Sequence, residues 1–323
     1  MNKLFDFKTE PLKDYRGVGE APREYEAYWD RARQALAEAP LSYELEKADF
    51  SCRSAEAYDL YFTGVGGARI HCQLLKPKGL SSKIPAVAMF HGYWTHSGDW
   101  TGKLGYIAEG YAVLAMDVRG QGGTSLDTGL YKGNTQSGHI IRGVESDSPD
   151  GLFYRNVYLD TAQAVDILAS MDFVDESRIF ATGASQGGAL TVACAALSKK
   201  LRGAAAVYPF LCDFRGVYQN SLSGNETYEE LIWYFRQRDP FHEKEEFFFE
   251  RLGYIDLKNI VGSILCDILW VTGLADNVCP PFAQMAAYNG ITSSKELVYL
   301  PEYGHEYLPF TGDKILAFFN WRL

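Results

Sequence analysis

The pentapeptide from Gly183 to Gly187, Gly-Ala-Ser-Gln-Gly, has the residue types and spacing of a turn that presents a nucleophilic serine. An apolar strand-like run (179–182) precedes it and an apolar, helix-like run follows, which is the context that a G-x-S-x-G elbow requires. The elbow is strained, and a side chain at Gly183 or Gly187 would crowd the neighbouring strand and helix. The alternative is a glycine-rich turn that only leads into a helix. We favour the elbow, with Ser185 as the nucleophile.

A serine hydroxyl needs an adjacent base, and His242 and His305 are the two histidines that follow Ser185. His242 lies in the charged stretch FHEKEE, which is typical of a solvated surface. His305 lies in a glycine-containing loop, PEYGHEY, between the last expected strand and the final helix. An isolated histidine can also be a core or surface residue. Its position and the lack of a rival nevertheless favour His305 as the base.

The base needs a carboxylate that orients it, and the acid is expected between the serine and the histidine in the chain. Asp276 follows the strand-like run DILWV, whereas Asp256 precedes it and lies at the wrong end. Glu302 and Glu306 are close to His305 in sequence, but adjacency along a loop does not place a carboxylate on the imidazole. We therefore expect Asp276 to be the acid, although an aspartate in a turn before a helix is also a frequent structural feature.

The negative oxygen that forms when a serine attacks an ester needs fixed N–H donors. One donor is expected from the residue after the nucleophile, Gln186, and the other from the loop after an early strand. That strand is the apolar run at 86–90, which leads into His91-Gly92-Tyr93 and offers the Tyr93 N–H. We interpret His91 as a brace for this loop rather than as a base.

The elements that must position these residues are short buried strands that alternate with helices. Runs typical of buried strands lie at 85–90, 111–118, 178–183, 204–209, 267–273 and 296–300, and helices are expected at about 104–109, 157–171, 186–197, 282–288 and 313–321. Such alternation predicts a mostly parallel central sheet with helices on both faces. Ligands of such sheets bind outside the carboxyl ends of the strands, where every candidate residue lies.

Two further regions frame this core. A helix from about Pro22 to Ala39 and a β-hairpin with a Gly-Gly turn over 55–77 form an N-terminal extension. Residues 213–256 are polar, aromatic and helical in pattern, which indicates a helical insertion above the sheet. The sequence therefore predicts one domain of the α/β-hydrolase fold over residues 1–323.

Composition excludes several classes of function. The net charge of −10, from 31 basic and 41 acidic residues, disfavours nucleic acid and anionic membranes as partners. No apolar run is long enough for a membrane span, and the first 15 residues lack the apolar stretch of a secretory signal, so we expect a cytoplasmic protein. The six cysteines form no CxxC pair and are expected to be reduced. No cluster has zinc-ligand spacing, and neither a metal nor an organic cofactor is expected.

Three motifs taken together are much more specific than the serine pentapeptide alone. They are Arg119-Gly120-Gln121, the run from Gly183 to Gly188, and Gly304-His305-Glu306. In this combination the chain resembles the acetyl xylan esterase and cephalosporin C deacetylase family, carbohydrate esterase family seven. Further similar stretches are LFDF at 4–7, HGY at 91–93, YRNVYLD at 154–160, DNVCPP at 276–281 and GHEYLP at 304–309, so that the resemblance covers nearly the whole chain.

The resemblance implies an α/β-hydrolase fold, the triad Ser185, Asp276 and His305, and the Tyr93 and Gln186 N–H groups as the oxyanion hole. It implies removal of acetyl groups from small acetylated sugars, xylo-oligosaccharides and cephalosporin C. It also implies an intracellular hexamer, a trimer of dimers whose active sites face an internal cavity.

Some residues of the resembling motifs lie outside the triad. We interpret Arg119 and Gln121 as braces of the loop beside the site, because a guanidinium presents a planar fork of donors. Cys279, in DNVCPP, could make the enzyme sensitive to thiol reagents. Tyr93, Trp94 and Trp100 could stack on sugar rings, and simple packing or an oligomer interface explains them equally well.

Three other functions compete with this interpretation. A peptidase-like hydrolase or a broad carboxylesterase would keep the fold, but such peptidases usually carry an extra N-terminal domain for which 323 residues leave no room. A non-catalytic binding protein on this scaffold would typically lack the serine or the histidine. A dinucleotide-binding enzyme is disfavoured because the glycines read G-x-S-x-G-G and not G-x-G-x-x-G.

Overall fold

A nine-stranded sheet organises the computed structural model, which describes residues 9–128, 135–220 and 226–323. The strands are β1 (Tyr43–Lys47), β2 (Ala55–Thr63), β3 (Arg69–Pro77), β4 (Ile84–Phe90), β5 (Ala112–Met116), β6 (Val174–Ala184), β7 (Leu201–Val207), β8 (Asp267–Gly273) and β9 (Lys295–Leu300). Their order is β1-β2-β3-β5-β4-β6-β7-β8-β9. The first four strands in this order (β1, β2, β3 and β5) pair antiparallel. The remaining pairs, from β5–β4 through to β8–β9, are all parallel. The expected mostly parallel sheet is confirmed.

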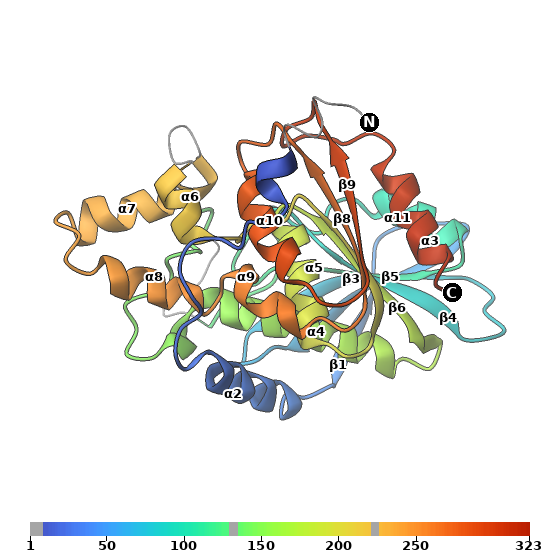
Figure 1. Cartoon of the computed structure of the whole chain (residues 1–323). Helices are drawn as coiled ribbons and strands as arrows, with labels where there is room; N and C mark the ends of the chain where they lie inside the picture. The colour runs from blue at the N-terminus through green and yellow to red at the C-terminus, as the bar shows by residue number, and fades with distance from the viewer. Residues whose placement is uncertain (1–8, 129–134, 221–225) are drawn as a thin grey trace.

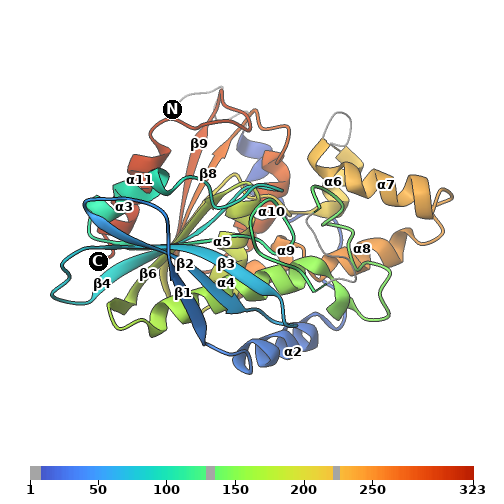
Figure 2. The same cartoon turned by 180° about the vertical axis from the view of Figure 1, so that it is seen from behind.

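Helices cover both faces of this sheet, as expected. They are α2 (Tyr25–Ala37), α3 (Leu104–Ala108), α4 (Phe153–Ser170), α5 (Gln186–Leu197), α6 (Phe214–Asn220), α7 (Glu229–Arg238), α8 (Glu245–Gly253), α9 (Leu257–Ile260), α10 (Pro281–Gly290) and α11 (Thr311–Asn320). Short 3₁₀ turns lie at Glu10–Leu12, Trp100–Lys103, Pro149–Gly151, Glu226–Tyr228 and Val261–Ser263. Helices α3 and α11 lie on one face, and α2, α4, α5, α9 and α10 lie on the other (Figures 1 and 2).

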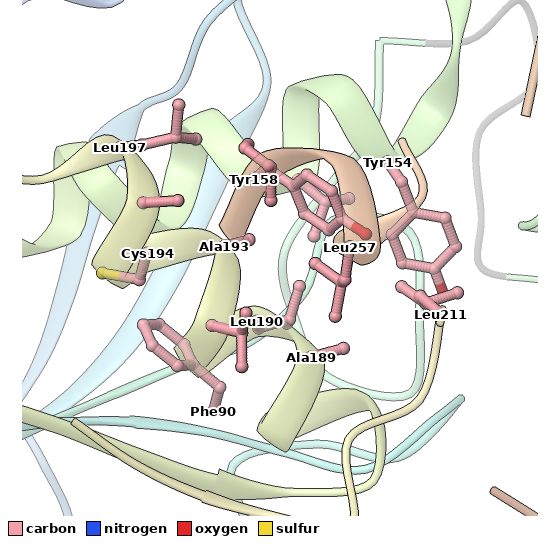
Figure 3. Packing of buried hydrophobic residues seen from close by; sticks show 14 of the residues in the cluster. Phe90, Tyr154, Tyr158, Ala189, Leu190, Ala193, Cys194, Leu197, Leu211 and Leu257 are labelled. Carbon is pink, nitrogen blue, oxygen red and sulfur yellow. The ribbon is translucent and has the colours of Figure 1, made fainter. Parts of the chain in front are cut away.

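The larger hydrophobic core lies between α4, α5 and the parallel strands. Strand β5 is buried at every residue, which explains why it reads as an uninterrupted apolar run. Helix α5 is also buried all round and contributes Leu190 and Cys194, close to Phe90 of β4 (Figure 3). Beyond α5, Tyr158 of α4 lies against Leu257 of α9 (Figure 3). The helix that begins directly after Ser185 is therefore held on all sides.

The N-terminal extension differs from the expectation in one element. The predicted hairpin is present as β2 and β3, and Gly66 and Gly67 in its turn have φ values of 79° and 88°, which a residue with a side chain rarely adopts. Strand β1 was not predicted. It is an edge strand whose residues are mostly exposed, so that its sequence YELEK carries no hydrophobic pattern. The LFDF stretch at 4–7 lies outside the described residues.

The region expected as a helical insertion contains α6, α7 and α8 between β7 and β8. These helices project from the side of the sheet that lies away from α11 (Figures 1 and 2). Helix α4 begins at Phe153, four residues before the expected start near Val157, because Phe153 and Tyr154 are already buried in the core. Among the described residues, no helix is long and apolar enough to cross a bilayer.

Candidate active site

Ser185 occupies the sharp turn between β6 and α5. Its backbone angles, φ 59° and ψ −120°, lie in a region that non-glycine residues rarely adopt. Three hydrogen bonds hold the turn: the Ser185 N–H donates to the Val207 carbonyl at 3.0 Å, and the Ser185 carbonyl accepts from Phe210 at 3.1 Å and Ala189 at 2.9 Å. The strained serine is thus fixed by its neighbours on β7 and α5, as a nucleophile elbow requires.

The glycines around this serine are required by close backbone approach. A Cβ atom at Gly187 would lie 2.1 Å from the Phe90 carbonyl oxygen, and one at Gly183 would lie 2.6 Å from the same atom. At Gly188 it would lie 2.6 Å from the Val207 carbonyl oxygen. The expected crowding at Gly183 and Gly187 is therefore present. Its source is the backbone at the end of β4 and, for Gly183, also the Gly187 backbone in α5, whose carbonyl oxygen would lie 2.5 Å from the Cβ.

The structure brings Ser185, His305 and Asp276 together from the ends of three strands. His305 Nε2 lies 3.0 Å from Ser185 Oγ, and His305 Nδ1 lies 2.9 Å from Asp276 Oδ2. Asp276 Oδ1 accepts hydrogen bonds of 2.8 Å from both the Val278 and the Cys279 backbone N–H groups. The Asp276 carboxylate is fully buried and the imidazole is 20% exposed. The arrangement can pass a proton from serine to histidine while the buried carboxylate holds the ring.

The loops that carry Asp276 and His305 are tied to each other. The Ala275 N–H donates to the Tyr303 carbonyl at 3.0 Å, and a Cβ at Gly273 would lie 2.2 Å from that oxygen. On its other side, the His305 ring lies 4.5 Å from the ring of Tyr208, a residue with φ of 32° after β7. Sequence reasoning missed Tyr208, because only its position at the end of a strand distinguishes it.

The two candidate oxyanion donors lie in adjoining segments. Gln186 is the first residue of α5, where N–H groups have no partner within the helix. Within the described residues, neither the Gln186 nor the Tyr93 backbone N–H donates a hydrogen bond. The Gln186 side chain connects the segments, because its Nε2 donates to the carbonyls of His91 at 3.4 Å and Gly92 at 3.3 Å.

His91 links the loop of residues 91–93, which carries the Tyr93 N–H, to the segment that follows β5. Its Nδ1 lies 2.7 Å from the Gly92 carbonyl oxygen, and its Nε2 lies 2.9 Å from the Val118 backbone N. The first contact needs a proton on Nδ1 and the second needs a lone pair on Nε2, which assigns the neutral Nδ1–H tautomer. Burial lowers the pKa of His91 and favours the same neutral form.

Gln121 and Arg119 do not touch the three candidate triad side chains. Gln121 and Gln186 exchange side-chain hydrogen bonds of 2.8 and 2.9 Å, and the Tyr154 hydroxyl donates to Gln186 Oε1 at 2.8 Å. Arg119 forms a bidentate pair with Asp160 of α4, with two N–O distances of 2.7 Å. Burial raises the pKa of Asp160, and the guanidinium opposes that rise.

The Arg119–Asp160 ion pair also contacts the turn of the β2–β3 hairpin, and the residue after Arg119, Gly120, has a positive φ. Arg119 Nη2 donates to the Val65 carbonyl at 3.0 Å, and a Cβ at Gly64 would lie 2.4 Å from Asp160 Oδ1. Gly120 has φ of 65°, a conformation that glycine adopts without strain. Asp160 lies in the stretch YRNVYLD, but nothing in the sequence paired it with Arg119.

The acetyl xylan esterase (AXE1) family model matches residues 1–322. The chain belongs to the acetyl xylan esterase family. Acetyl xylan esterase 1 from a Thermoanaerobacterium species is 46% identical, with a TM-score of 0.92 over 97% of this chain and 98% of that one. An acetyl xylan esterase from a Paenibacillus species is 34% identical, with a TM-score of 0.90 over 97% and 99%. The resemblance inferred from the motifs is confirmed.

Two further comparisons are more distant, one with a curated esterase and one with a structure that shares only the fold. Acetyl esterase Axe7A from Xylanibacter ruminicola is 27% identical over 307 residues, which are 91% of this chain and 65% of that protein. The chain thus spans about two thirds of the length of this curated relative. An acylaminoacyl peptidase from Pyrococcus horikoshii is 14% identical, with a TM-score of 0.60 over 84% of this chain and 42% of that one. That likeness shows the α/β-hydrolase fold alone.

Tyr93, Trp94 and Trp100 are the three aromatic residues that the sequence offers for stacking on a sugar ring. Tyr93 is buried, and its hydroxyl is bonded to Glu230. Trp100 stacks on Phe50 with ring centroids 5.8 Å apart, so packing accounts for it. Trp94 is 45% exposed, next to the candidate oxyanion donor, with φ of 52°. Trp94 is thus the most exposed of the three, and its ring centroid lies 5.0 Å from that of Tyr93.

Cys279 lies against the candidate triad but is not accessible. It is 1% exposed, and burial raises the pKa of its thiol, although a hydrogen bond with Ser185 opposes the rise. A buried, neutral thiol reacts slowly with thiol reagents.

Among the described residues, no group of three or more His, Cys, Asp or Glu side chains could hold a metal ion.

Proposed function

We propose that this protein is a serine esterase that removes O-acetyl groups from small acetylated carbohydrates such as xylo-oligosaccharides, and from cephalosporin C. The observation that carries the proposal is the chain of contacts from Asp276 through His305 to Ser185, with distances of 2.9 and 3.0 Å. Membership of the acetyl xylan esterase family supports the choice of acetyl esters.

In the first half-reaction, His305 Nε2 takes the proton of Ser185 as Oγ attacks the acetyl carbonyl carbon. The backbone N–H groups of Tyr93 and Gln186 stabilise the resulting oxyanion. The tetrahedral intermediate then collapses, and His305 donates the proton to the leaving sugar oxygen. The products of this half-reaction are the free alcohol and an acetyl group on Ser185.

In the second half-reaction, His305 takes a proton from a water molecule that attacks the acetyl-serine carbonyl. Collapse of the second intermediate releases acetate and returns the proton to Ser185. Asp276 keeps the imidazole in the Nδ1–H tautomer and stabilises its cationic form. The two backbone N–H groups on Asp276 Oδ1 hold this carboxylate in place throughout.

The substrate is proposed to be small, with Trp94 as a surface on which a sugar ring can stack. A homo-hexamer with active sites facing an internal cavity, a cytoplasmic location, and the absence of nucleic-acid and membrane partners stay predictions from the family resemblance and the net charge. Peptidase-like or broad carboxylesterase activity on the same site is the alternative.

The test is acetate release by the purified protein from acetylated xylobiose and cephalosporin C, with p-nitrophenyl butyrate alongside. Ser185→Ala removes the nucleophile, and Ser177→Ala is the matched control, since Ser177 is an exposed serine on the same strand. We expect acetate from both substrates with wild type and Ser177→Ala, and none with Ser185→Ala. Activity on the butyrate ester alone would move the function to the broad carboxylesterase class, and full activity of Ser185→Ala would overturn the proposal.

A further inference from the structure

Glu230, on α7 of the helical insertion, is a buried carboxylate to which the proposed reaction assigns no part. It is 2% exposed, and it accepts hydrogen bonds from the Tyr93 hydroxyl and from the Ile140 N–H, the latter at 2.8 Å. Burial raises the pKa of Glu230, and these hydrogen bonds, together with backbone donors at 138 and 141, oppose the rise. One side chain of the insertion therefore joins two loops that are far apart in the sequence.

The side chain that Glu230 holds belongs to the residue whose backbone N–H is the proposed oxyanion donor. The Tyr93 ring packs 5.5 Å from Phe210, and Phe210 donates its own backbone N–H to the Ser185 carbonyl. The Tyr93 hydroxyl also accepts from the His139 N–H at 3.3 Å. Tyr93 is thus fixed at its ring by the nucleophile turn and at its hydroxyl by Glu230.

Two sets of contacts act on the backbone around Tyr93. On one side, the Gly92 carbonyl, which belongs to the same planar peptide group as the Tyr93 N–H, lies 2.7 Å from His91 Nδ1 and accepts from the Thr95 hydroxyl at 2.9 Å and Gln186 Nε2 at 3.3 Å. On the other side, Trp94 adopts φ of 52°, a conformation that is strained for a residue with a side chain. The Trp94 side chain is exposed, so its burial contributes little to holding this conformation. The peptide group that carries the Tyr93 N–H is therefore anchored at the Gly92 carbonyl, and the contacts of the Tyr93 side chain anchor the Tyr93 end of the same group.

We propose that Glu230 is a positioning residue for the oxyanion hole: through the Tyr93 hydroxyl it fixes the direction of the Tyr93 backbone N–H. This inference rests on the proposed function, because it concerns a donor of that reaction. It assigns the helical insertion a part in turnover in addition to any part in shaping the site.

Glu230→Gln is the variant that changes this contact with the least change of shape. The carboxylate accepts with both oxygens, whereas an amide offers one acceptor and one donor. The amide NH₂ must therefore face either the Ile140 N–H or the Tyr93 hydroxyl, and one anchor is weakened. Loss of a whole oxyanion donor typically lowers turnover about 10²–10³-fold, so we expect misplacement of one to lower kcat about 10- to 100-fold.

Two matched variants identify the route of the effect. Tyr93→Phe keeps the backbone N–H and removes the hydroxyl, so we expect it to lower kcat as Glu230→Gln does. In the double variant the two changes break the same contact, and we expect a kcat close to that of either single variant. Glu229→Gln alters the exposed neighbour on α7 and is expected to behave as wild type.

The measurements are kcat and KM for p-nitrophenyl acetate, the Kd of a trifluoromethyl ketone, and thermal unfolding. The ketone adds to the serine and forms an oxyanion. We expect the ketone Kd to rise by the factor by which kcat falls, with KM changed less than about threefold, since ground-state binding does not use the oxyanion hole. A merely structural role would instead lower the melting temperature without this split between kcat and KM.

Wild-type kcat and ketone affinity in Tyr93→Phe would overturn the inference, even if Glu230→Gln failed to fold. So would an additive loss in the double variant. If the wild type has no esterase activity, or if Ser185→Ala retains it, the proposed function itself fails. If wild type and Ser185→Ala behave as proposed while Glu230→Gln and Tyr93→Phe keep full kcat, this inference alone fails.

Discussion

Asp276→Asn tests the proposed role of the carboxylate, because the structure determines which way the new amide must point. Asp276 Oδ1 accepts from two backbone N–H groups at 2.8 Å each, whereas Oδ2 faces His305 Nδ1 at 2.9 Å. An amide nitrogen cannot replace Oδ1, since it would set donor against two donors. The amide oxygen therefore stays on the backbone groups, and the NH₂ faces the histidine.

A donor at Nδ1 forces His305 into the tautomer with its proton on Nε2, where it cannot accept the Ser185 proton. In serine protease triads the equivalent change lowers turnover about 10⁴-fold, and we expect a similar fall in kcat for p-nitrophenyl acetate. The fold should survive, because both backbone contacts persist. Glu306→Gln changes the carboxylate beside His305 in the sequence and is expected to leave kcat little changed, since Glu306 Oε1 accepts from Gly304.

The result that would refute this reasoning is a fall of less than about tenfold in the folded Asp276→Asn protein. It would mean that another group sets the tautomer of His305. A large loss in Glu306→Gln, with an intact melting transition, would identify that residue as the acid instead.

Three further changes have expected outcomes. Gly187→Ala places a Cβ 2.1 Å from the Phe90 carbonyl oxygen, and we expect it to lower the free energy of unfolding, measured in urea, by more than about 2 kcal/mol. Gly105→Ala, in open space on α3, should not lower it. Trp94→Ala removes a stacking surface of about 1–2 kcal/mol, so KM for acetylated xylobiose should rise roughly 5- to 30-fold while that for p-nitrophenyl acetate stays the same. Burial lowers the pKa of His139 from 6.5 to about 4, so the unfolded chain binds its proton first and stability is lost as the pH falls from 6.5 to 4; His139→Gln should flatten that part of the urea stability profile.

The predictable part of the fold is the part whose burial leaves a local pattern. Strands β4 and β5 are almost wholly buried and read as apolar runs, and their alternation with helices determines a parallel sheet. Ser185 and Asp276 could be found because each follows such a buried run, and the carboxyl ends of parallel strands meet at one edge. His305 follows β9, an edge strand whose residues are only partly buried or exposed, and its position between the last strand and the final helix is what identified it.

The unpredicted part depends on contacts without a local pattern. Strand β1 is exposed and charged, and only its pairing with β2 makes it a strand. Tyr93 and Glu230 are separated by 137 residues, and the contact depends on how the insertion folds back on the sheet. The same holds for Arg119 and Asp160, which are 41 residues apart. Residue types alone do not pair such side chains.

The central claim is that Ser185 carries the acetyl group during turnover, and the direct measurement is mass spectrometry of the acid-quenched enzyme during hydrolysis of p-nitrophenyl acetate. We predict one acetyl group per chain, on the peptide that contains Ser185, with no label on the Ser185→Ala protein. An acetyl group on another residue that forms and disappears at the rate of turnover, or unchanged labelling and turnover in Ser185→Ala, would contradict the account.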